Sequence, residues 1–361
     1  MVCERCEECR RRRERFCRFC GDALGDSCSE CEVCRNEGVR FCSACGRPLT
    51  GPLDVLSNIV TVGGIIATCL LTLLLLFETA VMIWGIPNVL MALNGYSSWL
   101  IVIVPALVDV VRLDGVPLQI YYILLVMAVL ISVGYASLRS AGPVKDAVKG
   151  DISSIRNAPL FEICVLFSAL YIIELVIIII ADPNESISFD SKWIEMFELL
   201  EAPVWEEIIT RVLYISVPVM IVCMIRKTAD RPAWHYLFGG WKRFDTVTVV
   251  FILFSALMFG LAHYLGSWGA WKILPTFLFG LIAGYLFVKY GVYTTICIHF
   301  LTDYISSEMY LLDTSTMILT ALIVLFAALV CIPYVYIYAK KGLMHMSSVF
   351  RDIQRSFFRN S

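Results

Sequence analysis

This 361-residue sequence contains few histidines and has almost no net charge. It contains four histidines, 29 Lys and Arg and 31 Asp and Glu, so the formal net charge is -2. This balance gives no electrostatic sign of a nucleic-acid partner, and we do not expect one. Cysteines and arginines, and no apolar run, follow Met1, so we also expect no cleavable signal peptide.

Hydrophobic residues predominate over most of the chain. The sequence is 59% hydrophobic with a mean hydropathy of +0.77, and several apolar runs reach the roughly 20 residues that cross a hydrocarbon core. We therefore predict an all-α polytopic membrane protein with about eight transmembrane helices. The expected spans lie near 57–79, 119–138, 159–181, 204–225, 246–265, 272–289, 292–308 and 316–339.

A shorter apolar run, 98–112, is ambiguous. We interpret it as re-entrant, interfacial or packed beside the other helices, because a full span there would invert the orientation of everything after it. Basic residues are enriched in 139–158, in 226–243 and from Lys340 onward, whereas the segments before the fourth and the last spans are acidic. Positively charged loops stay on the cytoplasmic side. These patterns predict a multi-pass protein of the cell membrane with both termini in the cytoplasm.

Ten of the fifteen cysteines lie in the first 45 residues, in two copies of a 25-residue repeat. Each copy reads CxxC, ten residues, then CxxCG, with one additional cysteine, Cys9 or Cys34, after the first pair. Two CxxC pairs can supply the four thiolates of a tetrahedral zinc site. The spacing leaves two choices open in each copy, because Cys9 can replace Cys3 and Cys34 can replace Cys28.

The ten-residue version resembles the short zinc ribbons found in tandem at the ends of many prokaryotic proteins. That resemblance favours one zinc ion on Cys3, Cys6, Cys17 and Cys20 and a second on Cys28, Cys31, Cys42 and Cys45. Disulfides are disfavoured for a segment expected in the reducing cytoplasm. We interpret the head as a structural module or a site for a protein partner, rather than for nucleic acid.

The stretch VWEEIITRVLY, residues 204–214, places charged side chains inside a membrane segment. Such residues are costly in lipid and by default face a partner or a cavity. Glu207 and Arg211 are four residues apart and can pair on one helix face. Glu206 points about 100° away and has no partner in its own helix. This carboxylate is therefore a candidate general base.

Two of the four histidines also lie in apolar segments. His263 ends the run FILFSALMFGLAH, and His299 lies in TTICIHFLTDY with Asp303 one helical turn later. Antiparallel threading of the fourth and fifth spans brings Glu206 and His263 to the same leaflet, and His299 lies near the middle of the seventh. Glu174, in the third span, is a further candidate for this cavity, and so is Glu162, although Glu162 fits equally well as a residue that snorkels or bonds at a helix end.

These segments resemble a known family. EEIITR, FGLAH and HFLTD match the motifs EExxxR, FxxxH and HxxxN/D of the CPBP (ABI, or type II CAAX prenyl endopeptidase-like) intramembrane proteases, and PTFLFGLIAGYLFVKYGVYTTICIHFLTDY is similar to that family's segment between its second and third motifs. The resemblance covers about residues 160–310. Within it, Gly280 and Gly284 form a small-xxx-small pair that permits close helix packing.

The resemblance implies an intramembrane endopeptidase of glutamate or metallo type. Glu206 and His263 would activate a water, His299 and Asp303 would stabilise the oxyanion, and Arg211 would hold Glu207. Glu206 and the two histidines are also conceivable zinc ligands, so a metal at this site stays open. Position 303 is Asp where the prenyl-protease branch typically has Asn, and an ionised Asp cannot donate a hydrogen bond to an oxyanion. It could instead orient His299 or bind a metal.

The domain division predicted from these patterns has four parts: the zinc head 1–50, the first membrane helices and a cytoplasmic loop 51–158, the protease core 159–310, and the last helix with a basic tail 311–361. The expected partners are the lipid bilayer and a membrane-embedded, prenylated or otherwise hydrophobic peptide. The alternative function is a non-enzymatic membrane adaptor or immunity-type protein that recruits partners through its zinc ribbons. A proton-coupled transporter is disfavoured because the two halves of the membrane region show no inverted repeat.

Overall fold

The structure is a computed structural model of the whole chain. It describes residues 8, 9, 17, 42 and 44 of the cysteine-rich head, and residues 52–104, 106–181, 191–229, 231–266, 268–305 and 314–359 of the rest. The chain divides into two compact units, 1–62 and 63–361. Most of the predicted zinc ligands, namely Cys3, Cys6, Cys20, Cys28, Cys31 and Cys45, lie outside the described residues.

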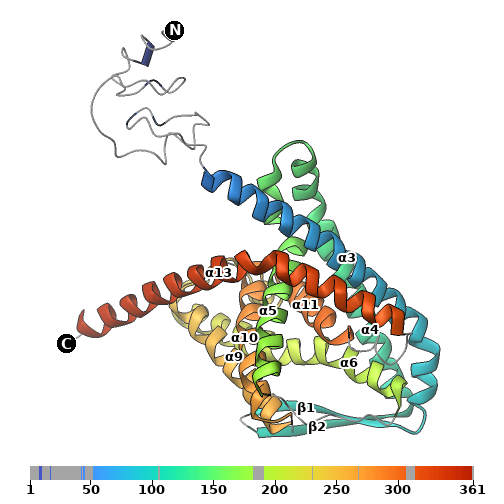
Figure 1. Cartoon of the computed structure of the whole chain (residues 1–361). Coiled ribbons are helices and arrows are strands. Elements are labelled where there is room, and N and C mark those ends of the chain that lie inside the picture. The colour runs from blue at the N-terminus through green and yellow to red at the C-terminus, as the bar shows by residue number, and fades with distance from the viewer. Residues whose placement is uncertain are drawn as a thin grey trace. The chain divides into compact units, whose positions relative to one another are not determined.

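Helices make up nearly all of the second unit (Figure 1). The α-helices are α3 (Pro52–Ala92, which begins in the first unit), α4 (Gly115–Val148), α5 (Pro159–Ala181), α6 (Lys192–Glu207), α7 (Val217–Ile225), α8 (Ala233–Leu237), α9 (Thr246–Leu265), α10 (Ile273–Lys289), α11 (Val292–Tyr304) and α13 (Thr314–Arg359). The shorter helical turns are η1 (Ile152–Asn157), the π-helix η2 (Ile208–Ser216) and η3 (Ala270–Lys272).

Seven helical segments among the described residues are long and apolar enough to cross a membrane: Ile59–Ala92, Gly115–Val148, Pro159–Ala181, Lys192–Ile225, Thr246–Leu265, Ala270–Lys289 and Thr314–Leu343. The prediction of an all-α polytopic membrane protein is confirmed. The expected span 292–308 corresponds to α11, whose 13 residues reach only about 20 Å at 1.5 Å per residue. That length is shorter than a hydrocarbon core of about 30 Å. Most of α11 is buried among other helices.

The ambiguous run 98–112 forms an antiparallel hairpin of β1 (Ser97–Val104) and β2 (Ala106–Asp114). Its density of Val and Ile favours strand over helix, because β-branched side chains fit a pleated surface better. The hairpin is tied to α6, since the indole Nε1 of Trp205 donates to the carbonyl oxygen of Ile101 at 2.8 Å. This run therefore does not cross the membrane as a helix.

Helix α11 lies at the centre of the second unit, where it contacts α4, α5, α6 and α10. Helix α9 packs closely on α10 because of the two predicted small residues. A Cβ on Gly280 would lie 2.7 Å from Ala256 Cα, and one on Gly284 would lie 2.9 Å from a methyl group of Ile252. Only glycine allows the two helices this separation.

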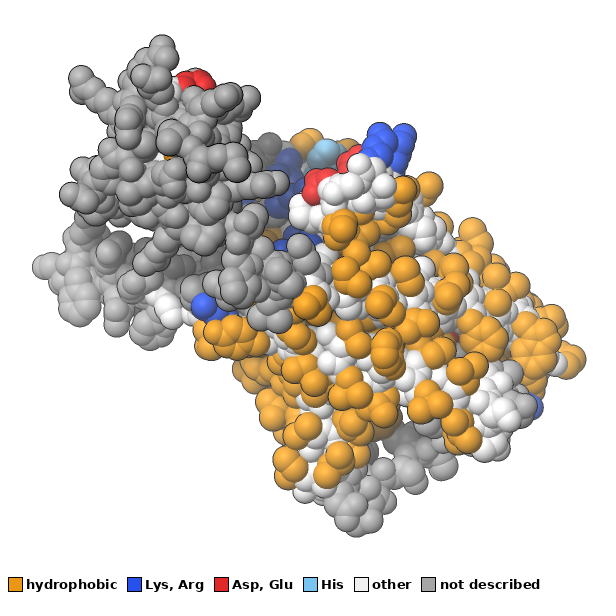
Figure 2. Space-filling model, turned by 45° about the horizontal axis from the view of Figure 1, so that its top comes forward, with side chains coloured by type: hydrophobic (Ala, Val, Ile, Leu, Met, Phe, Trp, Pro, Cys, Tyr) orange, Lys and Arg blue, Asp and Glu red, His pale blue; other side chains and the backbone are white. Residues whose placement is uncertain are grey.

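Hydrophobic side chains extend over much of the described surface shown in Figure 2, and charged side chains gather near its edge. Leu73, Leu138 and Ile180 are among the most exposed, at 65%, 75% and 78%. Exposed apolar surface of this extent is typical of helices that face lipid. The chain is an integral membrane protein.

Candidate active site

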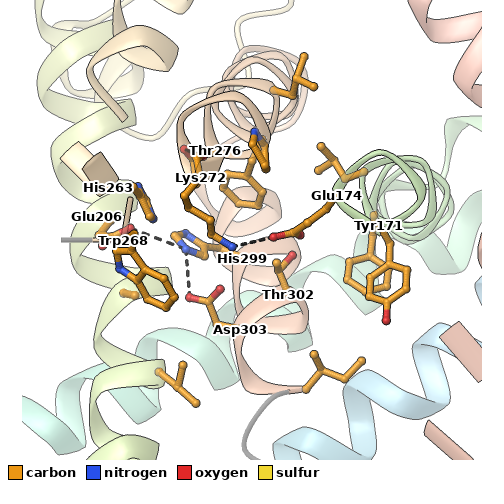
Figure 3. A pocket seen from close by; sticks show the side chains of 18 of the residues that line it. Tyr171, Glu174, Glu206, His263, Trp268, Lys272, Thr276, His299, Thr302 and Asp303 are labelled. Carbon is orange, nitrogen blue, oxygen red and sulfur yellow. Dashed lines mark hydrogen bonds and ion pairs between the residues drawn. The ribbon is translucent and has the colours of Figure 1, made fainter. Parts of the chain in front are cut away.

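A cavity of 610 Å³ lies between α5, α6, α9, α10, α11 and α13. Glu206, His263, His299 and Asp303 all line it, and Figure 3 shows them gathered at one side. Their helices are separated by up to about a hundred positions in the sequence, so this arrangement depends on the tertiary packing around α11. The structure thus brings two of the predicted carboxylates, Glu206 and Asp303, and both imidazoles to one cavity.

Glu207 and Arg211 lie behind this cavity and are both 0% exposed. Arg211 donates from Nε to Glu207 Oε2 at 2.8 Å and from NH2 to Oε1 at 3.3 Å. A third bond runs from NH1 to Ser255 Oγ in α9, at 2.9 Å. Paired and hydrogen-bonded in this way, the guanidinium is compensated inside the bundle.

The π-helix η2 begins directly after Glu207 and contains Arg211. π-helical segments inside α-helices are frequently found at functional sites. Here the π-helix is part of one continuous membrane segment from Lys192 to Ile225. It lies where the segment carries its buried ion pair.

His299 is held by carboxylates at both ring nitrogens. Its Nδ1 lies 3.0 Å from Glu207 Oε1, and its Nε2 lies 3.2 Å from Asp303 Oδ2 and 3.8 Å from Glu206 Oε2. Ionised carboxylates accept hydrogen bonds and donate none. Both nitrogens therefore interact best when both carry protons. The geometry favours a cationic His299 that Glu207 and Asp303 hold in orientation.

Glu206 differs from its neighbour Glu207. Its Oε2 is buried and has no hydrogen-bond partner among the described residues, and its side chain is 33% exposed on the cavity side. An unengaged buried carboxylate oxygen is costly unless a water or a ligand bonds to it. Glu206 is therefore the carboxylate available for chemistry.

The imidazole of His263 has one nitrogen committed to the backbone. Nδ1 lies 2.9 Å from the carbonyl oxygen of Phe259, one turn earlier in α9. A carbonyl oxygen can only accept, so Nδ1 carries the proton and, in the neutral ring, Nε2 keeps its lone pair. His263 thus offers the cavity a hydrogen-bond acceptor, whereas His299 offers a positive charge.

Phe259 is the first residue of the motif FGLAH, and its ring contacts the charged and titratable side chains of the site. Its centroid lies 4.7 Å from that of His263 and 5.8 Å from that of His299, and the Arg211 guanidinium lies 5.4 Å over its face. The aromatic ring of Phe259 therefore packs against both imidazoles and the guanidinium and restricts their orientations. Composition alone gave no role to this side chain.

The arrangement does not suit a metal ion at this site. Structural and catalytic zinc sites use three or four protein ligands, but both nitrogens of His299 are engaged by carboxylates and Nδ1 of His263 by a carbonyl. The donors that remain at the cavity are Nε2 of His263 and carboxylate oxygens of Glu206 and Asp303. Among the residues that the structure describes, no group of three or more His, Cys, Asp or Glu side chains could hold an ion.

The two candidate glutamates of the third span have different places. Glu174 lines the cavity and pairs with Lys272, a residue that no motif contains. Glu162 does not line it; it is 1% exposed and accepts hydrogen bonds from three tyrosines and a lysine, namely Tyr285, Tyr290, Tyr338 and Lys289. This cluster ties α5 to α10, to the turn that follows it and to α13.

The match to known proteins covers the segment that holds these residues. Residues 191–305 match the family described as type II CAAX prenyl endopeptidase Rce1-like, which is less than half of the chain. No curated protein and no solved structure matches the chain. The matched segment contains all six predicted site residues. The match supports the resemblance of the three motifs to the CPBP family of intramembrane proteases.

Proposed function

We propose that this protein is an intramembrane endopeptidase that hydrolyses a peptide bond with a water held between Glu206 and His263. The observation that supports this most is the contrast between two kinds of side chain in one cavity. Glu207, Arg211 and His299 satisfy one another, whereas Oε2 of Glu206 accepts no hydrogen bond from a described residue and lies 3.8 Å from Nε2 of His299. The unengaged carboxylate oxygen is the one placed to take a proton from water.

In this mechanism Glu206 accepts one proton of the water while Nε2 of His263 accepts a hydrogen bond from it. The water oxygen attacks the carbonyl carbon, and the negative charge that develops on the carbonyl oxygen is offset by the cationic His299. Glu206 then passes its proton to the departing nitrogen as the C–N bond breaks. The products are a carboxylic acid and an amine. Asp303 acts through His299, as a positioning residue.

The side chains that line the cavity indicate the class of substrate. α5 and α13 contribute an apolar side that includes Phe167, Leu170, Met317, Ala321 and Val324. Apolar walls of this kind bury hydrophobic groups favourably. A membrane-embedded or membrane-proximal peptide, hydrophobic or prenylated as the family description suggests, fits this environment.

The test compares reconstituted wild-type protein with Glu206→Gln on a panel of hydrophobic peptides, with products identified by mass spectrometry. Removal of the general base should lower turnover by about 10²- to 10⁴-fold. Glu195→Gln is the matched control, because Glu195 is on the same helix and does not line the cavity. Equal turnover by wild type and Glu206→Gln, or no cleavage by either, would reject the proposal.

We also propose that the head binds two zinc ions, one in each repeat. Cys9 and Cys17 are 1% and 0% exposed, and their sulfurs lie 3.9 Å apart. Two thiolates on one tetrahedral zinc lie about 3.8 Å apart, given Zn–S bonds of about 2.3 Å. The contact supports the choice in which Cys9 replaces Cys3 as a ligand, and Cys34 would replace Cys28 in the second repeat.

Zinc content per protein distinguishes the two choices. If Cys9 is a ligand, Cys9→Ser should lose one of two zinc ions, whereas Cys3→Ser should keep both. Loss with Cys3→Ser alone would support the ten-residue spacing instead. Absence of zinc from the wild-type protein would reject the metal sites altogether.

A further inference from the structure

Lys272 is the one lysine among the described residues that line the cavity, and it lies across from the proposed catalytic carboxylates. It is the last residue of η3, just before α10. Its Nζ lies 2.6 Å from Oε1 of Glu174 in α5, and the two side chains are 20% and 24% exposed. Figure 3 shows the lysine reaching past His299 toward Glu174. A cation therefore faces the same space as the proposed catalytic water.

Two tryptophans hold this ammonium group in place. Nζ lies 5.5 Å from the ring centroid of Trp268 and 5.1 Å from that of Trp271. The backbone of Lys272 is also fixed, because Thr276 donates from Oγ1 to its carbonyl oxygen at 2.7 Å. Aromatic faces attract a cation without neutralising it. An ammonium group carries three N–H donors, and the hydrogen bond to Glu174 uses one of them.

The distribution of charge in the cavity restricts where an anionic group of a peptide can lie. At the catalytic side the negative charges of Glu206 and Asp303 outnumber the positive charge of His299, which these carboxylates already flank, so a further carboxylate is repelled there. The apolar side chains of α5 and α13 offer it no hydrogen bond. Lys272 is the place where a carboxylate gains both attraction and donors. A peptide bound there would have its direction fixed by two points, the scissile bond at Glu206 and a carboxylate at Lys272.

We propose that Lys272 determines specificity by binding a carboxylate of the peptide substrate, either its C-terminal carboxylate or an acidic side chain. Glu174 holds the ammonium when no peptide is bound. The side chain of Glu174 is 24% exposed, so its carboxylate can be hydrated when a substrate carboxylate takes its place at Lys272. This inference rests on the proposed function.

The experiment measures binding, so that it does not depend on cleavage. Four versions of one fluorescent peptide rich in leucine and alanine are used: the C-terminal acid, the C-terminal amide, and two amides with a single internal Glu or Gln. Binding is measured on the full chain in nanodiscs, in a Glu206→Gln background that leaves the peptide intact. The acid and amide pair reports on a C-terminal carboxylate, and the Glu and Gln pair reports on a side chain.

We expect one carboxylate version to bind about tenfold tighter than its neutral match, as for a charge-assisted hydrogen bond. Lys272→Gln should remove this difference without weakening the neutral peptide, and Lys272→Arg should retain it. Glu174→Gln should increase the difference, because it frees the ammonium. Lys192→Gln is the matched control, since Lys192 also lies over a tryptophan ring, at 5.0 Å, but does not line the cavity.

Equal binding of all four peptides, or an equal loss for charged and neutral peptides in Lys272→Gln, would overturn the proposal. The proposed function is assessed separately, by cleavage with wild-type Glu206. If the protein cleaves the peptides but binds carboxylate and neutral versions equally, the proposed peptidase activity stands and the carboxylate subsite at Lys272 is rejected.

Discussion

Single side chains in the candidate active site are arranged so that each buried charge has an opposite charge beside it. Glu207 lies between Arg211 and His299, and His299 lies between Glu207 and Asp303. Burying such groups is costly, and the cost becomes severe when one member of a pair is removed. This arrangement makes the contribution of each residue separable by substitution.

Arg211→Met should destabilise the protein by about 3–5 kcal/mol, because it leaves the fully buried Glu207 with His299 as its only ion-pair partner among the residues that the structure describes. The double variant Glu207→Gln/Arg211→Met should cost less than the sum of the two single changes. Thermal unfolding in detergent measures both. Arg226→Met, at an exposed position, is the control; an equally small shift for both arginines would show that the buried pair contributes nothing.

Asp303→Asn should retain turnover within about tenfold, since an amide oxygen can still accept from Nε2 of His299 at the 3.2 Å separation seen for the carboxylate. Asp303→Ala should lose about 10- to 100-fold, the equivalent of one hydrogen bond to a charged group. Steady-state kinetics of the two variants give the comparison. If both variants are equally impaired, Asp303 does more than orient His299.

Sequence reasoning reached the ionisable residues of the site because they are conspicuous in apolar segments. Helical spacing alone gave the pairing of Glu207 with Arg211, which the structure has at 2.8 Å. Neither the carboxylates on both sides of His299 nor the backbone bond that fixes His263 could be derived, because they depend on how separate helices pack. Lys272 was missed for a similar reason: it follows a loop, and a lysine there looks like a solvated residue.

At the scale of the helix and strand, close packing depends on glycines at defined positions in α10. Gly280→Ala should destabilise the protein by about 1–3 kcal/mol, because its Cβ would lie 2.7 Å from the Ala256 backbone and force α9 and α10 apart. Gly134→Ala is the matched control: a Cβ there meets nothing within 4 Å, so helix propensity should make it neutral or slightly stabilising. Unfolding midpoints in detergent that are equal for both variants would contradict the packing argument.

The bounds of several helices could be predicted closely, since 159–181 and 246–265 coincide with α5 and α9. The hairpin could not, because a short apolar run rich in Val and Ile has no period that separates a strand from a buried helix. α3 and α13 are longer than expected, at Pro52–Ala92 and Thr314–Arg359. Hydrophobicity marks the part of a helix inside lipid and gives no signal for a polar extension beyond it.

At the scale of the whole molecule, orientation follows from the basic loops. We expect a protease-sensitive epitope inserted after Glu185 to be cleaved from the outside of intact cells, and one inserted after Thr228 to be protected, because positive loops stay in the cytoplasm. Protease protection in cells and in inverted vesicles measures both sites. The reverse pattern would place the basic loops outside and invert the predicted topology.

The most direct measurement of the central claim is an experimental structure of the full chain in a lipid nanodisc, at a resolution that shows ordered water. The account predicts solvent density within hydrogen-bonding distance of both Oε2 of Glu206 and Nε2 of His263, with His299 held between Glu207 and Asp303. A map in which Glu206 and His263 lie far apart, or in which Glu206 faces acyl chains, would contradict it.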